Sequence, residues 1–298
     1  MGKITKDKRD IYYRLAKENE YRSRSAFKLL QIDQKFDFIK DSFFIVDLCA
    51  APGGWSQVVS KKINSNNKDN FKIISVDLQE FSELKDVDQV IGDITKNTTF
   101  DKIMEKTEKN LINLVLSDCA PDISGLNEFD SYIQFQLILA SLNISIRMLS
   151  EGGNFISKIF RGKYTPQILQ ILSHFFKTIT IAKPKACRNA SFESFLVCEN
   201  FYIKEETKEL RIKKVELSDL ILLNNLYNDD EEYEDLDKLG IKFIQVGDDE
   251  YDSDKTYDIV IDENKNNTFL EVLQKPINPP YKFYFDNLNN KIVDNTKK

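Results

Sequence analysis

Asp47-Leu-Cys-Ala-Ala-Pro-Gly-Gly-Trp55 is the stretch of this sequence that decides the fold. The apolar run Phe43-Phe-Ile-Val46 precedes it, and the helix-like segment Ser56-Gln-Val-Val-Ser-Lys61 follows it. A strand that enters a tight turn and then opens a helix is where a doubly wound α/β sheet binds a nucleotide-like ligand. The spacing differs from Gly-x-Gly-x-x-Gly, so a pyrophosphate cradle is not indicated, and S-adenosylmethionine, which has no phosphates, fits better. An ordinary strand–helix turn is the alternative interpretation.

Three further apolar runs each end in an aspartate. They are Lys72–Asp77, Val90–Asp93 and Leu111–Asp118, and each reads as a strand. Any one of these acids alone has an alternative role as a helix N-cap. Because the carboxyl ends of parallel strands meet at one crevice, three such acids after a Pro-Gly-Gly turn favour a shared site. Asp77 also stands at the sequence separation expected for a carboxylate that accepts hydrogen bonds from ribose hydroxyls.

The rest of the first 200 residues alternates helical and extended patterns, which is typical of a parallel sheet with helical crossovers. Apolar residues recur at helical spacing from Ser131 to Leu149, and Glu151-Gly-Gly-Asn154 is predicted to end that helix. Thr165-Pro166 is predicted to begin another helix. Further strands are predicted at 155–160, 178–182 and 194–198.

Charge divides the chain into two predicted regions. Residues 3–40 carry eleven basic and six acidic side chains, whereas residues 229–262 carry three basic and fourteen acidic ones. We predict a domain over residues 1–200 with basic N-terminal helices, and an acidic, partly disordered C-terminal extension over residues 201–298 with one strand near 241–246. The basic front suits contact with RNA phosphates, and a solvated helix face is the alternative. The acidic extension suits partner docking or surface regulation, and a solubilising tail is the alternative.

The composition argues against several classes of protein. No apolar run approaches the roughly 20 residues of a membrane span, and the charged N-terminus lacks the apolar core of a secretory signal. The cysteines form no Cys-x-x-Cys pair, and Cys49 and Cys198 lie in predicted strands, so Cys49, Cys119, Cys187 and Cys198 are expected to be reduced thiols in a cytoplasmic protein. The one histidine, His174, is expected to be structural, which argues against a zinc site or a histidine-based catalyst.

Several motifs stand in an order that points to one family. They are Asp47-Leu-Cys-Ala-Ala-Pro-Gly-Gly-Trp-Ser-Gln57, Val76-Asp-Leu-Gln79, Gly92-Asp-Ile-Thr95, Ser117-Asp-Cys-Ala-Pro-Asp122 and Lys158-Ile-Phe-Arg-Gly162. This set resembles the FtsJ/RrmJ family of RNA ribose 2′-O-methyltransferases. The segments that resemble the eukaryotic tRNA branch of that family are 2–17, 25–33, Lys183–Ser191, Tyr251-Asp-Ser-Asp254 and Pro276-Ile-Asn-Pro-Pro-Tyr281.

The resemblance implies a fold and a catalytic site. The fold class is α/β, a Rossmann-like S-adenosylmethionine-dependent methyltransferase sheet of seven strands, one of them antiparallel, with helices on both faces. The catalytic residues are Lys28, Asp118, Lys158 and Glu193. Lys158 would accept the proton of the ribose hydroxyl, and Lys28 would lower the pKa of Lys158. From the residues alone, Lys158 has an alternative role as a solubilising residue on an edge strand, and Glu193 has one as a surface carboxylate.

The resemblance also assigns the cofactor, S-adenosylmethionine. Gly53 and Trp55 are placed at its methionine end, Asp77 at its ribose and Asp93 near adenine, while Asp118 is shared with the catalytic site. Trp55, the one tryptophan, has an alternative role as a core aromatic residue at the start of a helix.

The implied substrate is an anticodon-loop ribose of tRNA, at nucleotide 32 or 34, and the implied partners are a WD-repeat protein and a helical-repeat protein that choose the nucleotide. Ribosomal RNA is the alternative substrate. A methyltransferase-like RNA-binding subunit without activity is the alternative from another class, although Lys28, Asp118, Lys158 and Glu193 are all present.

Overall fold

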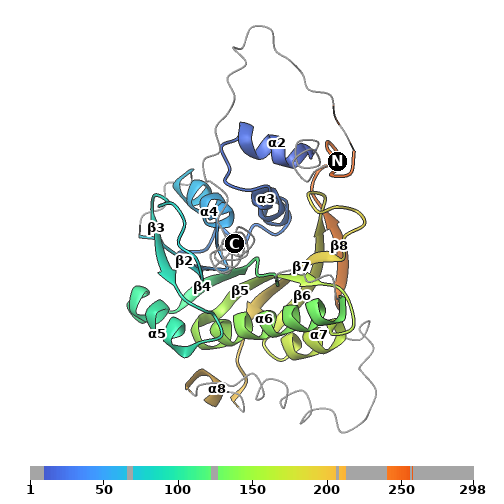
Figure 1. Ribbon diagram of the computed structural model, residues 1–298. Helices are drawn as coiled ribbons and strands as arrows, with labels where there is room; N and C mark the ends of the chain where they lie inside the picture. The colour runs from blue at the N-terminus through green and yellow to red at the C-terminus, as the bar shows by residue number, and fades with distance from the viewer. Residues whose placement is uncertain are drawn as a thin grey trace, which may run out of the picture.

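One mixed sheet organises the chain, and its strands lie in the order β3-β2-β1-β4-β5-β7-β6-β8 (Figure 1). The computed structural model describes residues 10–65, 70–121, 127–205, 208–212, 240–255 and 257. Within these residues β7 runs antiparallel to both β5 and β6, and the other pairs are parallel. The strands are β1 Phe44–Leu48, β2 Lys72–Asp77, β3 Val87–Ile91, β4 Ile112–Ser117, β5 Leu149–Phe160, β6 Phe176–Pro184, β7 Glu193–Phe201 and β8 Lys242–Val246.

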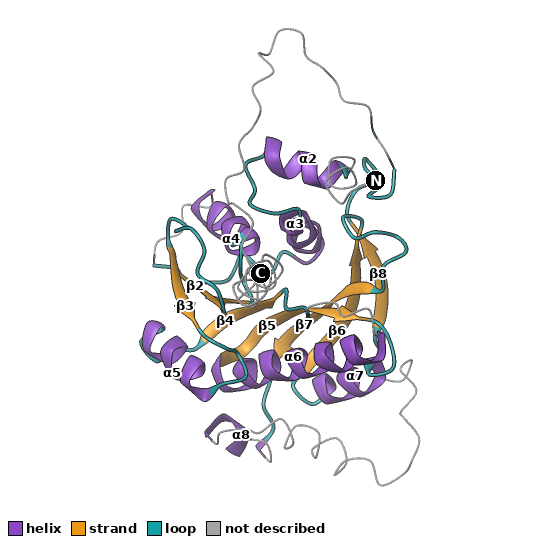
Figure 2. Cartoon of the chain, viewed as in Figure 1, coloured by secondary structure: helices purple, strands orange, loops and turns teal. Residues whose placement is uncertain are grey.

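Helices cover both faces of this sheet, as the family resemblance implied (Figure 2). One face carries α2 Ile11–Glu18, α3 Ser25–Phe36 and α4 Gly54–Ser65, and the other carries α5 Asn97–Lys106, α6 Asn127–Met148 and α7 Thr165–Ser173. The short α8, Glu209–Ile212, lies beyond α6. A strand buried on both faces needs apolar residues at every position. In β4, Leu114 and Leu116 therefore pack on the α3–α4 side while Val115 packs on the α6 side.

The predicted strands match the observed ones with two differences. The strand predicted over Val90–Asp93 is β3, which ends at Ile91, two residues before Asp93. The second difference lies around residue 150. The helix expected over 131–149 is α6, which begins at Asn127 and ends at Met148. The turn predicted at Glu151-Gly-Gly-Asn154 is wrong, because these residues lie inside β5. The pairing of β4 with β5 shifts register between Ile112 and Leu114, and Gly152 adopts a φ of 79° opposite this shift. A bulged strand and a turn therefore share the same glycine-rich signature.

The C-terminal region contributes an eighth strand to the same sheet. The strand predicted near 241–246 is confirmed as β8, which pairs in parallel with β6. The segment after it returns to the domain: Ser253 Oγ donates to the carbonyl of Cys187 at 2.8 Å, and Asp254 accepts from the amide of Asn189 at 2.7 Å. Residues 276–281 and most of the acidic stretch lie outside the described residues.

No helix in the described part of the chain combines the length and the apolar character that crossing a membrane requires. Among the same residues, no group of three His, Cys, Asp or Glu side chains could hold a metal ion.

Candidate active site

Four charged side chains from four separate elements meet at the carboxyl ends of the central strands. Lys158 Nζ lies 2.9 Å from Asp118 Oδ1 and 3.6 Å from Glu193 Oε1. Lys28 Nζ lies 2.5 Å from the same oxygen of Glu193. The four side chains are only 11–18% exposed. The structure thus brings together all four residues that the sequence singled out for catalysis.

The strand register explains this meeting. Asp118 follows the last residue of β4, and Ser117 pairs with Ser157 of β5, so Lys158 lies next to Asp118. Across the antiparallel pair, Lys158 faces Phe195 and Phe160 faces Glu193, which places Glu193 diagonally from Lys158. Side chains in such diagonal positions remain within reach of a long residue.

Two alternative interpretations are wrong in light of this geometry. Lys158 is not on an edge strand, because β5 lies between β4 and β7. Glu193 is not a surface carboxylate, because its side chain is 12% exposed and bonded to Lys28. Burying an ionised group away from water is costly unless an opposite charge accompanies it, and here two ammonium groups offset two carboxylates.

Burial and charge act in opposite directions on these groups. Burial alone would raise the pKa of Asp118, but Lys158 and Lys28 outweigh it and hold that pKa below its usual value. Burial also opposes ionisation of Glu193, but Lys28 and Lys158 hold its pKa low. Burial would lower the pKa of Lys158, but Asp118 and Glu193 raise it. The two carboxylates thus dominate the pKa of Lys158, and the expectation that Lys28 lowers it stays a prediction.

Ser25, which sequence reasoning missed, connects Asp118 to Trp55. Its hydroxyl donates to Asp118 Oδ2, while the indole N–H of Trp55 donates to the carbonyl of Ser25 at 3.0 Å. Trp55 is 2% exposed and packs 5.6 Å from the ring of Phe195. The core interpretation of Trp55 is confirmed, and its role toward a cofactor stays a prediction. In the sequence, Ser25 could have been identified as a site residue because it begins the Ser25-Ala-Phe-Lys28 motif.

The turn after β1 requires glycine at position 53. Gly53 has a φ of 96°, and a Cβ atom on it would lie 2.7 Å from Phe81 Cε2 and 3.0 Å from Leu84 Cδ1. Both the left-handed conformation and the close contact require glycine. The side chain of Asp77 secures the turn, because Oδ2 accepts from the amide of Ala51 at 2.9 Å.

The carboxylates near this turn suit a ligand with hydroxyls and a positive charge. Asp77 ends β2 beside the turn, and Asp118 lies just past the end of β4. The turn sequence itself contains no lysine or arginine that would hold a diphosphate. These features fit S-adenosylmethionine. Asp93 accepts from the amide of Thr95 at 2.9 Å and from its hydroxyl at 2.7 Å, so it orders its own turn, and its place near adenine stays a prediction.

Asp47, the first residue of the decisive stretch, is a second residue that sequence reasoning missed. Its side chain is fully buried, and Oδ2 accepts from the hydroxyl of Ser56 at 2.5 Å. Burial raises the pKa of Asp47 to about 7, against the opposing effect of that hydrogen bond. Asp47 lies near the carboxyl end of β1 and, through Ser56, joins this strand to α4. The signal for it was its position in the motif.

The expectation of four reduced cysteines is wrong for two of them, because Cys49 and Cys119 form a disulfide. Leu48 of β1 pairs with Ser117 of β4, so the residues that follow these two strands lie close together, with Cα atoms 5.1 Å apart. A separation of 70 residues hides this proximity in the sequence. Cys49 also lies beyond the end of β1, with a φ of 57°, rather than in a strand. Cys187 and Cys198 are free and buried.

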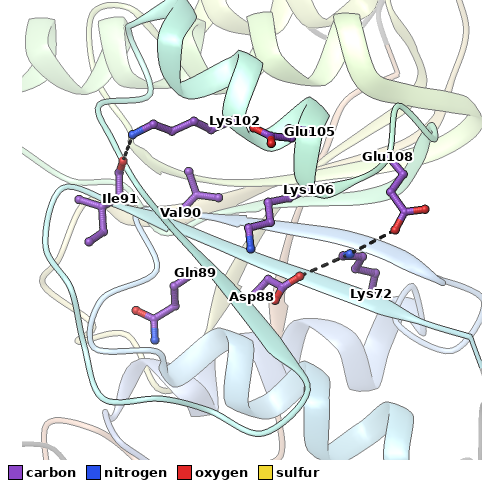
Figure 3. A pocket seen from close by; sticks show the side chains of 9 residues that line it. All are labelled: Lys72, Asp88, Gln89, Val90, Ile91, Lys102, Glu105, Lys106 and Glu108. Carbon is purple, nitrogen blue, oxygen red and sulfur yellow. Dashed lines mark hydrogen bonds and ion pairs between the residues drawn. The ribbon is translucent and has the colours of Figure 1, made fainter.

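A separate cavity of about 520 Å³ lies near the opposite end of β2, between β3 and α5. Figure 3 shows Lys72, the first residue of β2, between Asp88 at 3.5 Å and Glu108 at 3.9 Å. Lys102 donates to the carbonyl of Ile91 at 3.0 Å. The lining of this cavity carries three lysines and three acidic residues: Lys72, Lys102, Lys106, Asp88, Glu105 and Glu108.

The comparisons with known proteins agree with this geometry. A tRNA (cytidine(32)/guanosine(34)-2′-O)-methyltransferase of Mus musculus is 42% identical over 290 residues, which cover 94% of this chain and 85% of the mouse protein. The protein of the same description from Schizosaccharomyces pombe is 38% identical over 289 residues, covering 95% and 96%. A Plasmodium falciparum crystal structure described as a ribosomal RNA methyltransferase has a TM-score of 0.55 and 28% identity, and it covers 62% of this chain and 100% of that one.

The family model for FtsJ-like methyltransferases matches residues 21–201, which include all of the strands from β1 to β7 and the four charged residues around Lys158. This chain therefore belongs to the FtsJ-like methyltransferase family.

Proposed function

We propose that this protein transfers a methyl group from S-adenosylmethionine to the ribose 2′-hydroxyl of nucleotide 32 or 34 in the anticodon loop of tRNA. The observation that carries the proposal is the buried contact of Lys158 with Asp118 and Glu193. Relatives that match nearly the whole chain are described as tRNA cytidine32/guanosine34 2′-O-methyltransferases, which supports the choice of RNA.

The chemistry needs a group that takes the hydroxyl proton while oxygen, carbon and sulfur lie in line. S-adenosylmethionine, when bound, supplies the methyl group on a positively charged sulfur. Lys158 Nζ accepts the ribose proton after it has released its own proton to solvent. Asp118 and Glu193 hold Nζ in place through the 2.9 Å and 3.6 Å contacts. Lys28 anchors Glu193 and keeps the cluster neutral.

For the cofactor, this chain offers the turn at Gly53 and the carboxylates of Asp77 and Asp118. Asp77 is proposed to accept hydrogen bonds from the ribose hydroxyls, and Asp118 is proposed to attract the charged end. Gly53 permits the positive φ of this turn and its close contact with Phe81. Trp55 positions Asp118 indirectly, because its indole N–H donates to Ser25, whose hydroxyl donates to Asp118.

The protein partners are a further part of the proposal. A WD-repeat protein and a helical-repeat protein would select the nucleotide, and the C-terminal extension beyond about residue 201 would dock one of them. The extension is acidic, whereas the N-terminal segment proposed to contact RNA is basic. An acidic extension would repel RNA phosphates, which favours a protein as the ligand of the extension.

The direct test is methylation of an unmodified anticodon stem-loop with radiolabelled S-adenosylmethionine, with and without the two partner types, followed by nucleoside mapping. We expect label at nucleotide 32 or 34 and none with Lys158→Ala. Label only in ribosomal RNA would favour the alternative substrate. Absence of label in both RNAs, together with a failure to bind the cofactor in calorimetry, would favour a binding subunit without activity.

A further inference from the structure

The loop after β5 places basic side chains against aromatic rings just past the end of the strand that carries Lys158. The guanidinium of Arg161 lies 4.8 Å from the ring centre of Phe243, and Lys163 Nζ lies 5.9 Å from that of Tyr164. Arg161 follows Lys158 by three residues, so it lies at the same end of β5 as Lys158 but on the opposite face of the sheet, toward α6 and α7. Within this part of the chain, cations and rings alternate over a short distance, which is the pattern of surfaces that bind single-stranded nucleic acid.

Phe192 completes the surface from the opposite strand. The amide of Arg161 donates to the carbonyl of Phe192 at 3.0 Å, one step beyond the pair Phe160–Glu193. Residues directly opposite in an antiparallel pair share a face and have Cβ atoms about 5 Å apart. The rings of Phe192 and Phe243 are 68% and 52% exposed, although phenylalanine is usually buried.

A second pair of rings extends the surface toward α6. Tyr132 is 45% exposed, and its ring centre lies 6.0 Å from that of Tyr164. Tyr164 also stacks on the buried Phe135 at 5.1 Å, which fixes its orientation. The exposed rings therefore lie just before β7 (Phe192), on β8 (Phe243) and on α6 (Tyr132).

We propose that Phe192, Arg161, Phe243, Lys163 and Tyr132 form a binding surface for the unpaired nucleotides next to the methylated one. In this surface the exposed rings stack on bases and the two cations face phosphates. The inference rests on the proposed function, because it takes the ligand to be a single-stranded RNA loop. Stacking tolerates any base, so this surface holds the loop while leaving the choice of nucleotide to other contacts.

The test measures RNA binding without turnover, by fluorescence anisotropy of a labelled anticodon stem-loop with the full-length protein. Stacking of one base on an aromatic ring corresponds to roughly a 5-fold to 150-fold change in affinity. We expect Phe192→Leu to weaken binding by a factor in that range and Phe192→Trp to retain it. The matched control is Phe43→Leu, because Phe43 is also exposed, at 45%, but lies just before β1 at the other end of the sheet.

Salt dependence separates the cations from the rings. Each phosphate contact to a single strand contributes about 0.7 to the slope of log affinity against log salt. Arg161→Gln and Lys163→Gln should each reduce this slope, whereas Phe192→Leu should leave it unchanged. A 2-aminopurine base beside the target nucleotide should lose fluorescence on binding to the native protein and regain it with Phe192→Leu.

Equal RNA affinity for Phe192→Leu and Phe43→Leu would overturn the proposal. This holds even if Phe192→Leu loses binding to a partner protein. The absence of any stem-loop binding by the native chain would overturn it as well. Failure of the proposed function looks different: the native chain would bind the stem-loop through Phe192, yet no methylated ribose would form in it.

Discussion

Replacing Lys158 by methionine should remove turnover and destabilise the fold, and the two effects can be separated. Methionine has a similar length and no charge, so it fills the space between Asp118 and Glu193 without neutralising either. Lys158 Nζ contacts both carboxylates, and all three side chains are at most 18% exposed. Glu193 retains its direct contact with Lys28 at 2.5 Å, whereas Asp118 retains the Ser25 hydroxyl and the charge of Lys28, with which it forms no direct ion pair. Asp118 is therefore the group that loses its direct ionic partner.

The size of each effect follows from this asymmetry. Removing one partner of a buried ion pair costs about 3–5 kcal/mol of folding free energy. Loss of a positioned general base costs roughly 10²–10⁴ in rate. The double variant Lys158→Met/Asp118→Asn removes the unpaired charge, so it should recover most of the stability and none of the activity. A double-mutant cycle with Asp118→Asn then gives the coupling between the two residues.

Urea denaturation at neutral pH gives the stability of all four proteins, and single-turnover methylation of saturating stem-loop RNA gives the rate. The reasoning about a buried four-charge cluster is refuted if Lys158→Met unfolds at the same urea concentration as the native protein. The assignment of Lys158 as the base is refuted if the double variant methylates at a native rate.

Three further changes test the electrostatics and the C-terminal region. Asp118→Asn removes the negative charge that raises the pKa of Lys158 most, so this pKa should fall. The rising limb of the pH–rate profile should then move to lower pH, and an unmoved limb would contradict this prediction. Burial raises the pKa of Asp47 to about 7, so between the usual carboxyl pKa and neutral pH the folded protein binds more protons than the unfolded chain. The free energy of unfolding should therefore fall as pH rises through that window. Asp47→Asn should make this free energy less dependent on pH, and an unchanged pH dependence would contradict the reasoning. A chain ending at Asn200 should lose stability and activity relative to one ending at residue 257, and equal behaviour would show that the β8 region is dispensable.

Physical reasoning from the sequence predicted the parallel part of the sheet and the place of its strand-end acids. A parallel sheet places the carboxyl ends of its strands at one edge, so strand-end acids such as Asp77 and Asp118 are brought to the same edge by topology alone. The same argument applies to Lys158, because an ammonium group in an apolar strand needs a buried partner. Resemblance was needed for Lys28 and Glu193, since neither ends an apolar run.

Properties that depend on three-dimensional proximity could not be predicted. The pairing of Cys49 with Cys119 depends on the register of β1 with β4. The pKa of Lys158 depends on which charges lie nearest in space. Its contacts with the carboxylates of Asp118 and Glu193 follow from the folded structure. The basic front is also partly used internally: Arg24 pairs with Asp10, and Arg22 donates to the carbonyls of Pro52 at 3.2 Å and Glu83 at 2.8 Å.

The acidic C-terminal region shows why net charge alone is a poor guide to function. Asp252 and Asp254 count toward the acidity of residues 229–262, yet they accept hydrogen bonds from Asn189 at 3.2 Å and 2.7 Å. Asn189 precedes Glu193 by four residues, so these carboxylates hold the loop that leads into the catalytic cluster. Both carboxylates keep their negative charge, because the donors of Asn189 are neutral, but they also have a structural role in the domain. The net charge of residues 229–262 therefore does not show which of its acidic residues hold the fold together and which are available to a ligand.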